Sequence, residues 1–113
     1  MEWIFEIEDL TGRKIHLSQE QWSHINSDHP EISAYVEEMK DIFKNPALVN
    51  TLSYDQQIRY FYRYYKNKLS PAKYLLVIVK YLNGKGFIIT SYFVRKIPWK
   101  APCESIMMKK EIY

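Results

Sequence analysis

Four segments in the second half of the chain are rich in β-branched and aromatic residues, and short turn-like breaks separate them. The break before the last segment contains Asn83-Gly84, a dipeptide that favours a two-residue hairpin turn. Connections this short join antiparallel neighbours, so the pattern predicts a four-stranded antiparallel meander. Residues 74–79 are nearly all apolar, which predicts a central strand covered on both faces. The four predicted strands are residues 48–54, 58–66, 73–82 and 86–94.

The first half of the chain predicts a hairpin followed by two helices. Two short segments on either side of Gly12, residues 3–7 and 14–17, suit the hairpin. Ser18 and Gln21 fit a capping box that opens a helix, which ends near residues 28–29 because Pro30 follows. Pro30 also suits the start of a second helix, whose apolar residues recur every three or four positions up to residue 43. The predicted fold class is α+β, with the hairpin and two helices packed on the four-stranded sheet.

Length and composition predict one globular domain over residues 1–113. Hydrophobic residues make up 47% of the chain, enough for one core. Neither a membrane-spanning run nor a signal peptide is recognisable, so we expect a cytoplasmic protein without a membrane partner. Cys103 is the only cysteine, which excludes an internal disulfide and a cysteine-based zinc site. The tail over 97–113 is ambiguous, since residues 105–113 suit either a short helix or an edge strand.

Charge is divided unevenly along the chain. Residues 1–57 contain four Lys/Arg and eleven Asp/Glu, a balance of −7, whereas residues 58–113 contain twelve and two, a balance of +10. Such a division indicates two surfaces with different roles, or two halves that fold against each other. A polyanion would be expected on a surface that gathers the second half's cations.

The segment 59–66 alternates cations with aromatic rings. On a strand, Arg59 and Arg63 share a face about 13 Å apart, from a rise of roughly 3.3 Å per residue. Guanidinium groups can hold phosphates while rings stack on unpaired bases, so this pattern suits RNA. A half-exposed strand that tyrosine favours and arginine keeps soluble explains it equally well.

Further polar candidates lie on the next two predicted strands. Lys80 ends an otherwise apolar strand, where it either approaches a phosphate or simply reaches solvent. Thr90 and Tyr92 share a strand face, and both hydroxyls can donate to a phosphate oxygen. Both are also common strand residues, so their types alone do not establish a site.

The three histidines are candidates for acid–base chemistry rather than for metal binding. His24 and His29 are five residues apart with a helix end between them, and no HExxH, HxH or carboxylate cluster accompanies them. Their side chains titrate near neutral pH when unperturbed. A histidine at a helix end can also act only in capping or packing. We therefore expect no metal and no cofactor.

Several elements of the chain resemble a known family when taken in order. The order and spacing resemble those of phage- and mobile-element-associated nuclease-like domains in the barnase–EndoU–colicin–RelE-like superfamily. The resemblance covers about residues 15–95; the family's tail is usually short and variable, so the resemblance implies nothing for residues 97–113. The elements are Ile15-His16-Leu17-Ser18, Trp22, His24-Ile25, His29-Pro30-Glu31, Asn45-Pro46, Tyr64-Tyr65-Lys66, residues 73–80 and residues 88–92.

The resemblance implies a small, metal-independent endoribonuclease with a toxin-like role, helices packed on a four-stranded antiparallel sheet, and an acidic antitoxin or immunity protein as partner. In such a site a base removes the 2′-OH proton, the 2′-oxygen attacks phosphorus, and an acid protonates the leaving 5′-oxygen, which gives a 2′,3′-cyclic phosphate. At the positions that match the family, the resemblance implies that His24 acts as the general acid or base, and that Tyr92 or His29 supplies the other of these two roles. Thr90 would donate a hydrogen bond to phosphate. The cations available for substrate binding are Arg59, Arg63, Lys66 and Lys80.

The alternative function is a non-catalytic module of the same fold that binds RNA or a protein. Three histidines and several cations on a small sheet suit a binder as well as an enzyme. A third possibility is an interaction protein with an acidic helix surface and a basic sheet surface.

Overall fold

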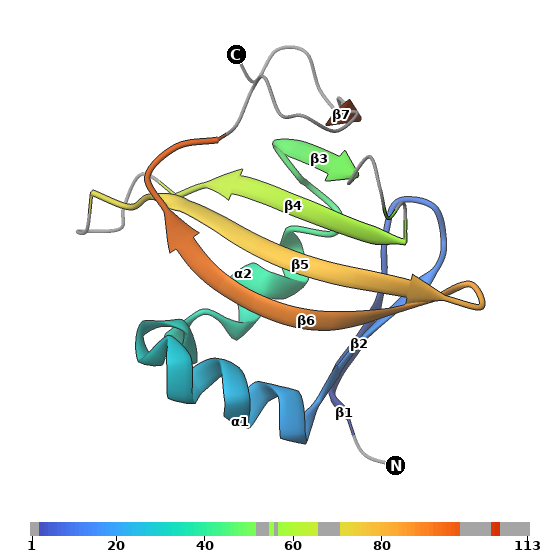
Figure 1. Cartoon of the computed structure of the whole chain (residues 1–113), viewed down its shortest axis with the longest axis horizontal. Coiled ribbons are helices and arrows are strands. Elements are labelled where there is room, and N and C mark those ends of the chain that lie inside the picture. Colours follow the sequence, from blue (N-terminus) through green and yellow to red (C-terminus); the bar gives the residue numbers. More distant parts are fainter. Residues whose placement is uncertain (1–2, 52–54, 56, 66–70, 98–104, 107–113) are drawn as a thin grey trace.

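The computed structural model describes residues 3–51, 55, 57–65, 71–97 and 105–106 (Figure 1). Its elements confirm the α+β class. No helix in these residues is long and apolar enough to cross a membrane. In chain order the elements are β1 (Trp3–Glu8), β2 (Lys14–Ser18), α1 (Gln19–Asp28), the 3-10 helix η1 (Pro30–Ala34), α2 (Val36–Asp41), β3 (Leu48–Thr51), β4 (Ile58–Tyr64), β5 (Tyr74–Leu82), β6 (Lys85–Val94) and β7 (Ser105–Ile106).

The described strands form one mixed sheet in the order β1-β2-β6-β5-β4-β3-β7. Strands β3 to β6 pair successively and antiparallel, as the short breaks predict. The prediction of a four-stranded antiparallel sheet with a separate hairpin is nevertheless wrong, because β2 pairs in parallel with β6 and adds the hairpin to the sheet. Gly86 permits this approach: a Cβ there would lie 3.0 Å from Val79 Cγ1 and still closer to the Ile15 side chain of β2.

Strand β5 and its hairpin with β6 follow the local sequence signals. Residues 75–79 are all buried, as expected for a strand covered on both faces. Asn83 and Gly84 join β5 to β6 with φ values of 55° and 78°. Two successive positive φ values characterise the tight hairpin turn that Asn-Gly favours.

Helix α1 begins where the capping signal predicts. The Ser18 hydroxyl accepts a hydrogen bond of 3.0 Å from the backbone N–H of Gln21. The Gln21 side chain, however, donates to the carbonyl oxygen of Ile89 on β6, so it ties the helix to the sheet instead of completing a capping box.

The single second helix that the periodicity predicts is divided into η1 and α2. Tyr35 separates them with φ −121° and ψ 27°, and its ring packs edge-on against Phe93 with centroids 4.8 Å apart. The apolar stripe is still buried across the break, including Ile32, Met39 and Phe43. The hydrophobic spacing therefore predicted the buried side correctly but not the interruption.

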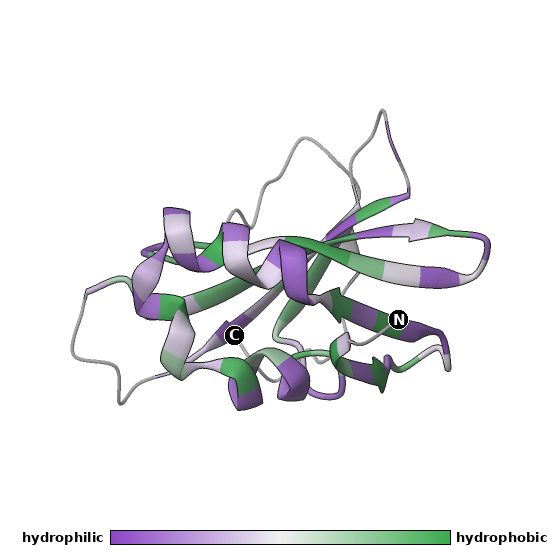
Figure 2. Ribbon diagram, turned by 90° about the horizontal axis from the view of Figure 1, so that it is seen from below, coloured by the Kyte–Doolittle hydropathy of each residue, from purple (hydrophilic) through white to green (hydrophobic). Residues whose placement is uncertain are grey.

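The two faces of the sheet carry separate cores. We call the face that packs against α1, η1 and α2 the helix face; its core includes Ile25, Ile32 and Met39 from the helical elements. We call the opposite face the far face. Figure 2 shows mainly polar colouring along α1 and longer apolar stretches in the strands. The buried far-face core consists of Leu48, Tyr62, Leu76, Ile78 and Ile97.

The described part of the tail favours one of the two predicted alternatives. Residues Ser105–Ile106 form the edge strand β7, which pairs antiparallel with β3. Lys66 and Cys103 lie outside the described residues, so the structure does not place these two predictions.

Candidate functional site

Lys80, Thr90 and Tyr92 lie on the far face of the sheet. The cross-strand register establishes this, because residues directly opposite each other on neighbouring strands project to the same side. Each of the three is half-buried and pairs with a residue of the far-face core or one packed against it. The pairs are Ile58 with Lys80, Ile78 with Thr90, and Leu76 with Tyr92.

A β-bulge brings Thr90 and Tyr92 to this face. Strand register shifts between Ile78 and Val79, where β6 contains an additional residue, Ile89. In a regular strand, Thr90 and Tyr92 would point to the face opposite Phe87, the partner of Lys80. The alternation in the sequence predicts that Thr90 and Tyr92 share a face, but the bulge decides which face.

Arg59 and Arg63 lie on the other side of the sheet, among the residues of the helix face. Arg63 is bound within the fold: its Nη1 donates to the carbonyl oxygen of Asn45, and its Nε lies 3.5 Å from Asp41 Oδ2. The guanidinium carbon is also 5.7 Å from the centre of the Tyr65 ring. The cations of the second half are thus divided between two faces, and the charge asymmetry of the sequence does not define one binding surface.

Tyr65 belongs to the same structural group as Arg63. Its hydroxyl donates to the carbonyl oxygen of Glu38 over 3.4 Å. Burial, with a smaller contribution from Asp41, raises the pKa of Tyr65 to about 12 despite the neighbouring Arg63. Tyr65 therefore stays protonated near neutral pH and serves the packing between β4 and the helices.

Arg59 belongs to a second network, centred on Asp9 and Tyr81. The Tyr81 hydroxyl donates to Asp9 Oδ2 over 2.8 Å, and the guanidinium carbons of Arg13 and Arg59 lie 4.6 and 5.1 Å from the Tyr81 ring centre. Burial tends to raise the pKa of Asp9, but hydrogen bonds from Thr11, Tyr81 and the Arg13 backbone outweigh it and lower that pKa. Burial and the bond to Asp9 raise the pKa of Tyr81.

His29 and Tyr92 are in direct contact. Their rings stack with centroids 4.7 Å apart and an interplanar angle of 21°. His29 ends α1 and precedes η1, and its backbone N–H donates to the Ile25 carbonyl oxygen, which fixes the position of its backbone. Neither the imidazole nitrogens of His29 nor the Tyr92 hydroxyl has a hydrogen-bond partner among the described residues.

His24 does not join this contact. Its side chain is exposed on α1 and makes no hydrogen bond, ion pair or ring contact within the part of the chain that the structure describes. The side chains of Thr90 and Lys80 likewise have no hydrogen-bond or ion-pair partner there. The structure thus brings His29 to Tyr92, with Thr90 two residues away on β6, and leaves His24 apart from the described contacts of that group.

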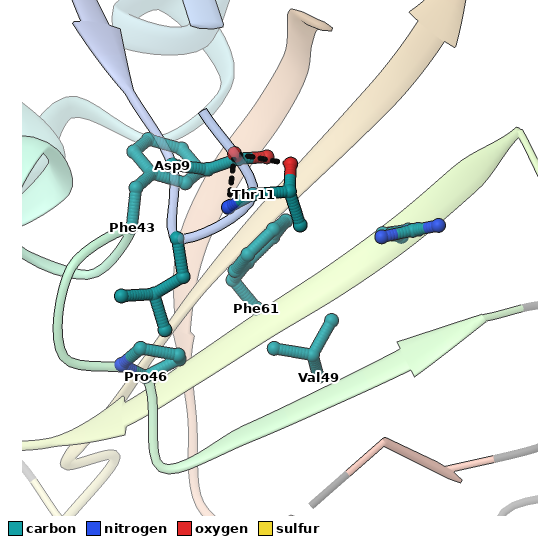
Figure 3. A pocket seen from close by; sticks show the side chains of 8 residues that line it. Asp9, Thr11, Phe43, Pro46, Val49 and Phe61 are labelled. Carbon is teal, nitrogen blue, oxygen red and sulfur yellow. Dashed lines mark hydrogen bonds between the residues drawn. The ribbon is translucent and has the colours of Figure 1, made fainter. Parts of the chain in front are cut away.

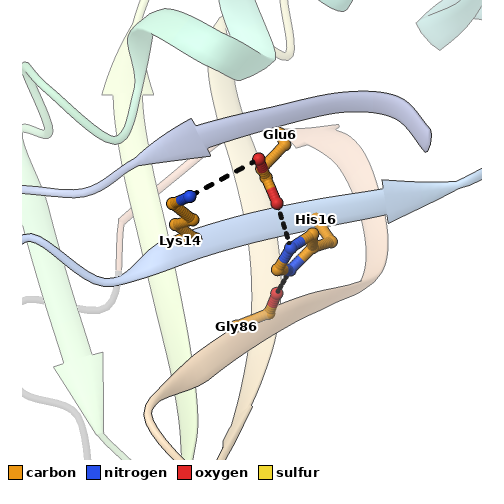
Figure 4. A network of polar contacts seen from close by, with 4 residues as sticks. All are labelled: Glu6, Lys14, His16 and Gly86. Atoms are coloured by element: carbon orange, nitrogen blue, oxygen red, sulfur yellow. Dashed lines mark hydrogen bonds and ion pairs between the residues drawn. The ribbon is translucent and has the colours of Figure 1, made fainter. Parts of the chain in front are cut away.

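His16, the third histidine that the sequence offers for acid–base chemistry, is a buried polar residue of the far face. It is 5% exposed; its Nε2 lies 2.6 Å from Glu6 Oε2 and its Nδ1 lies 3.2 Å from the Gly86 carbonyl oxygen (Figure 4). Both partner atoms are acceptors, so both nitrogens donate at once only in the protonated imidazolium. The ring also contacts Trp3 and Phe87, with centroids 4.5 and 5.4 Å apart.

Three lysines lie near His16 at one end of the far face. Lys14 pairs in register with Lys85, and Lys80 pairs with Phe87, which neighbours His16. Lys14 lies 3.9 Å from Glu6, whereas Lys80 and Lys85 make no ion pair with a described residue. We call Lys14, Lys80 and Lys85 the basic corner. Alternation along the strands could have identified its members, but only the parallel pairing of β2 with β6 brings them together.

The described residues contain no group of three or more histidine, cysteine, aspartate or glutamate side chains arranged to hold a metal ion. Comparisons with other proteins, made by sequence and by structure, give no match to a family model and no significant match to a curated protein or a solved structure.

Proposed function

We propose that the protein is a metal-independent endoribonuclease whose site lies on the far face, along Lys80, Thr90, Tyr92 and His29. The observation that supports this best is the stacking of His29 on Tyr92 at 4.7 Å. It joins two groups capable of proton transfer, neither of them hydrogen-bonded to a described side chain. The resemblance over residues 15–95 implies the same class of reaction.

The spacing of the four residues suits one RNA strand. Thr90 and Tyr92 are about 6–7 Å apart along β6, from the rise per residue of a strand. Lys80 is two residues beyond Ile78, the partner of Thr90, and so lies diagonally across from Thr90 at roughly 7–8 Å between Cα atoms. An RNA strand along this row would meet first a cation, then a hydroxyl, and then the ring pair.

Each group has a defined part in the proposed reaction. His29 accepts the proton of the ribose 2′-OH while the 2′-oxygen forms a bond to phosphorus. The bond from phosphorus to the 5′-oxygen breaks, and the Tyr92 hydroxyl donates its proton to that oxygen. Lys80 and Thr90 stabilise the charge on the non-bridging oxygens. Proton transfer from the imidazolium to the phenolate then restores the enzyme, and the products are a 2′,3′-cyclic phosphate and a 5′-hydroxyl.

The resemblance also implies a toxin-like role. An antitoxin or immunity protein that inhibits the enzyme would then present acidic residues to the basic corner, which includes Lys80, and not to Arg63 on the opposite face of the sheet. Charge complementarity of this kind mainly accelerates association and fixes orientation.

The proposal is tested by incubating the purified protein with single-stranded RNA in EDTA. Wild type should cleave, and His29→Ala should lower the cleavage rate by about 100-fold or more, the usual contribution of a general base. His24→Ala is the matched variant, because it removes an exposed histidine from the same helix. Loss of activity in His24→Ala with retention in His29→Ala would transfer the acid–base role to His24 and reject the assignment made here.

A second candidate function is RNA binding without cleavage, and the basic corner favours it. Lys80 and Lys85 have no ion-pair partner among the described residues, and the half-buried ring of Phe87 lies between Lys80 and His16 in the register. Ammonium groups beside an aromatic ring can hold phosphates and stack on a base. Binding that weakens steeply with salt while the RNA stays intact in EDTA would favour this function over the first.

A further inference from the structure

A pocket opens on the helix face, away from the residues proposed to cleave RNA. Its volume is about 140 Å³, and it lies between the β1–β2 turn, the segment that follows α2, and strands β3 and β4 (Figure 3). Buried apolar side chains form most of its wall: Phe43, Pro46, Val49 and Phe61. An engineered protein cavity of about 150 Å³ with apolar walls holds benzene, so this pocket accepts a group of about phenyl size.

The acidic residue at the pocket, Asp9, already accepts four hydrogen bonds within the fold. Asp9 Oδ1 accepts hydrogen bonds from the Thr11 backbone, the Thr11 hydroxyl and the Arg13 backbone at 2.6 to 3.0 Å. Its Oδ2 accepts from the Tyr81 hydroxyl at 2.8 Å. A ligand therefore gains little by offering a hydrogen-bond donor to Asp9.

The cationic residue at the pocket, Arg59, has a hydrogen-bond donor that no described residue uses. The Nε atom of Arg59 is buried and has no hydrogen-bond partner in the described part of the chain. The guanidinium lies 5.1 Å from the Tyr81 ring centre, and Asp9 holds that tyrosine in place, so the cation is positioned in advance. Asp9 balances only one of the two charges on Arg13 and Arg59, which leaves a net positive charge at the pocket.

We infer that this pocket binds a small carboxylate that carries an apolar group of about phenyl size. The apolar group occupies the space between Phe43, Val49 and Phe61, and the carboxylate accepts hydrogen bonds from the Arg59 guanidinium. Guanidinium and carboxylate groups match in a two-pronged geometry, which favours a carboxylate over a neutral acceptor. A free aromatic acid and the C-terminal residue of a peptide both present this chemistry.

The test uses NMR on the wild-type protein with two carboxylate probes, phenylacetate and N-acetyl-Gly-Phe. Each is compared with its neutral amide. Both acids should shift the Nε–H signal of Arg59, and their ring protons should show NOEs to the Val49 methyl groups. The amides should bind at least about 10-fold more weakly, because they lose a charge-assisted hydrogen bond. The acid that binds more tightly shows whether the pocket prefers a free aromatic acid or the C-terminal residue of a peptide.

A pair of charge-matched variants tests the role of Arg59. Arg59→Met should weaken binding of the preferred acid by about 10-fold or more, whereas Arg95→Met removes an exposed arginine at the end of β6 and should leave it unchanged. Equal binding of acid and amide, or the absence of NOEs to Val49, overturns the inference. Both results come from the wild-type chain, so they hold even if Arg59→Met fails to fold. RNA cleavage is not involved, so failure of either proposal leaves the other intact.

Discussion

The imidazole ring of His29 stacks on the phenol ring of Tyr92, with centroids 4.7 Å apart, where α1 ends and η1 begins. The contact connects the helical layer to strand β6. Strand β2 pairs with β6 only over residues 85–87, so the later half of β6 lies beside α1 and η1 instead of beside β2. The stack therefore depends on the short length of β2, and it places a histidine next to residues of the far face.

Tyr92→Phe separates the chemical role of the hydroxyl from the packing role of the ring. The phenylalanine retains the stack on His29, and the hydroxyl that is lost has no partner among the described residues. We expect the rate of RNA cleavage in EDTA to fall by about 100-fold, while RNA affinity and the melting temperature stay near those of wild type. Cleavage at the wild-type rate would show that Tyr92 is not the acid.

Lys80→Gln should weaken RNA binding in a way that salt reveals. If Lys80 contacts one phosphate, its loss should reduce the slope of log affinity against log salt by about 0.7 for a single strand. Lys44→Gln serves as the control. It removes the same charge at an exposed position that follows α2. Equal slopes for the two variants would place the RNA away from Lys80.

His16→Phe tests the polar network of the far face. The substitution keeps a ring between Trp3 and Phe87 but leaves the Glu6 carboxylate and the Gly86 carbonyl oxygen without their donor. We expect a loss of about 1–3 kcal/mol in the free energy of unfolding, measured by urea denaturation. His24→Phe, at an exposed position, should change it by less than about 0.5 kcal/mol. A stable His16→Phe protein would contradict the importance of the two hydrogen bonds.

The lowered pKa of Asp9 makes the stability of the fold sensitive to acid. Its pKa is lower in the folded chain than its ordinary value of 3.8, so the folded state binds this proton less readily than the unfolded state. The resulting stabilisation is complete above about pH 4 and is lost as the pH falls through the lower folded value. Asp9→Asn should therefore flatten the decline of unfolding free energy below pH 4.

The control for this pH measurement is Asp28→Asn, at an exposed carboxylate at the end of α1 that has no hydrogen-bond or ion-pair partner among the described residues. Its pH profile should follow that of wild type. If Asp9→Asn and Asp28→Asn give the same profile, the four hydrogen bonds to Asp9 are not the source of the acid sensitivity.

Local signals in the sequence predicted those parts of the fold that local interactions determine. Ser18 begins α1, Asn83-Gly84 forms the turn between β5 and β6, and residues 75–79 are buried in a central strand. The second helix is divided at Tyr35, whose ring contacts Phe93, a residue distant in sequence, and no spacing of apolar residues reveals this interruption.

Features that depend on pairing between distant strands were not predictable in this way. In the parallel pairing of β2 with β6, the Ile15 side chain occupies space that a side chain at position 86 would need, and the far-face location of Thr90 requires the bulge at Ile89. Alternation correctly placed Arg59 and Arg63 on one face, but only the register across strands shows that Lys80 faces the other way. The sequence could nominate candidate residues, whereas their grouping required the sheet.

The nature of the cleaved ends tests the central proposal most directly. A single-stranded RNA and the same strand with one 2′-deoxy nucleotide at the cleavage position are each incubated with the protein in EDTA, and the new ends are identified by mass spectrometry. We predict a 2′,3′-cyclic phosphate and a 5′-hydroxyl from the RNA, no cleavage at the deoxy position, and a rate lowered by about 100-fold or more in His29→Ala. Intact RNA, or cleavage that ignores the missing 2′-hydroxyl, would contradict it.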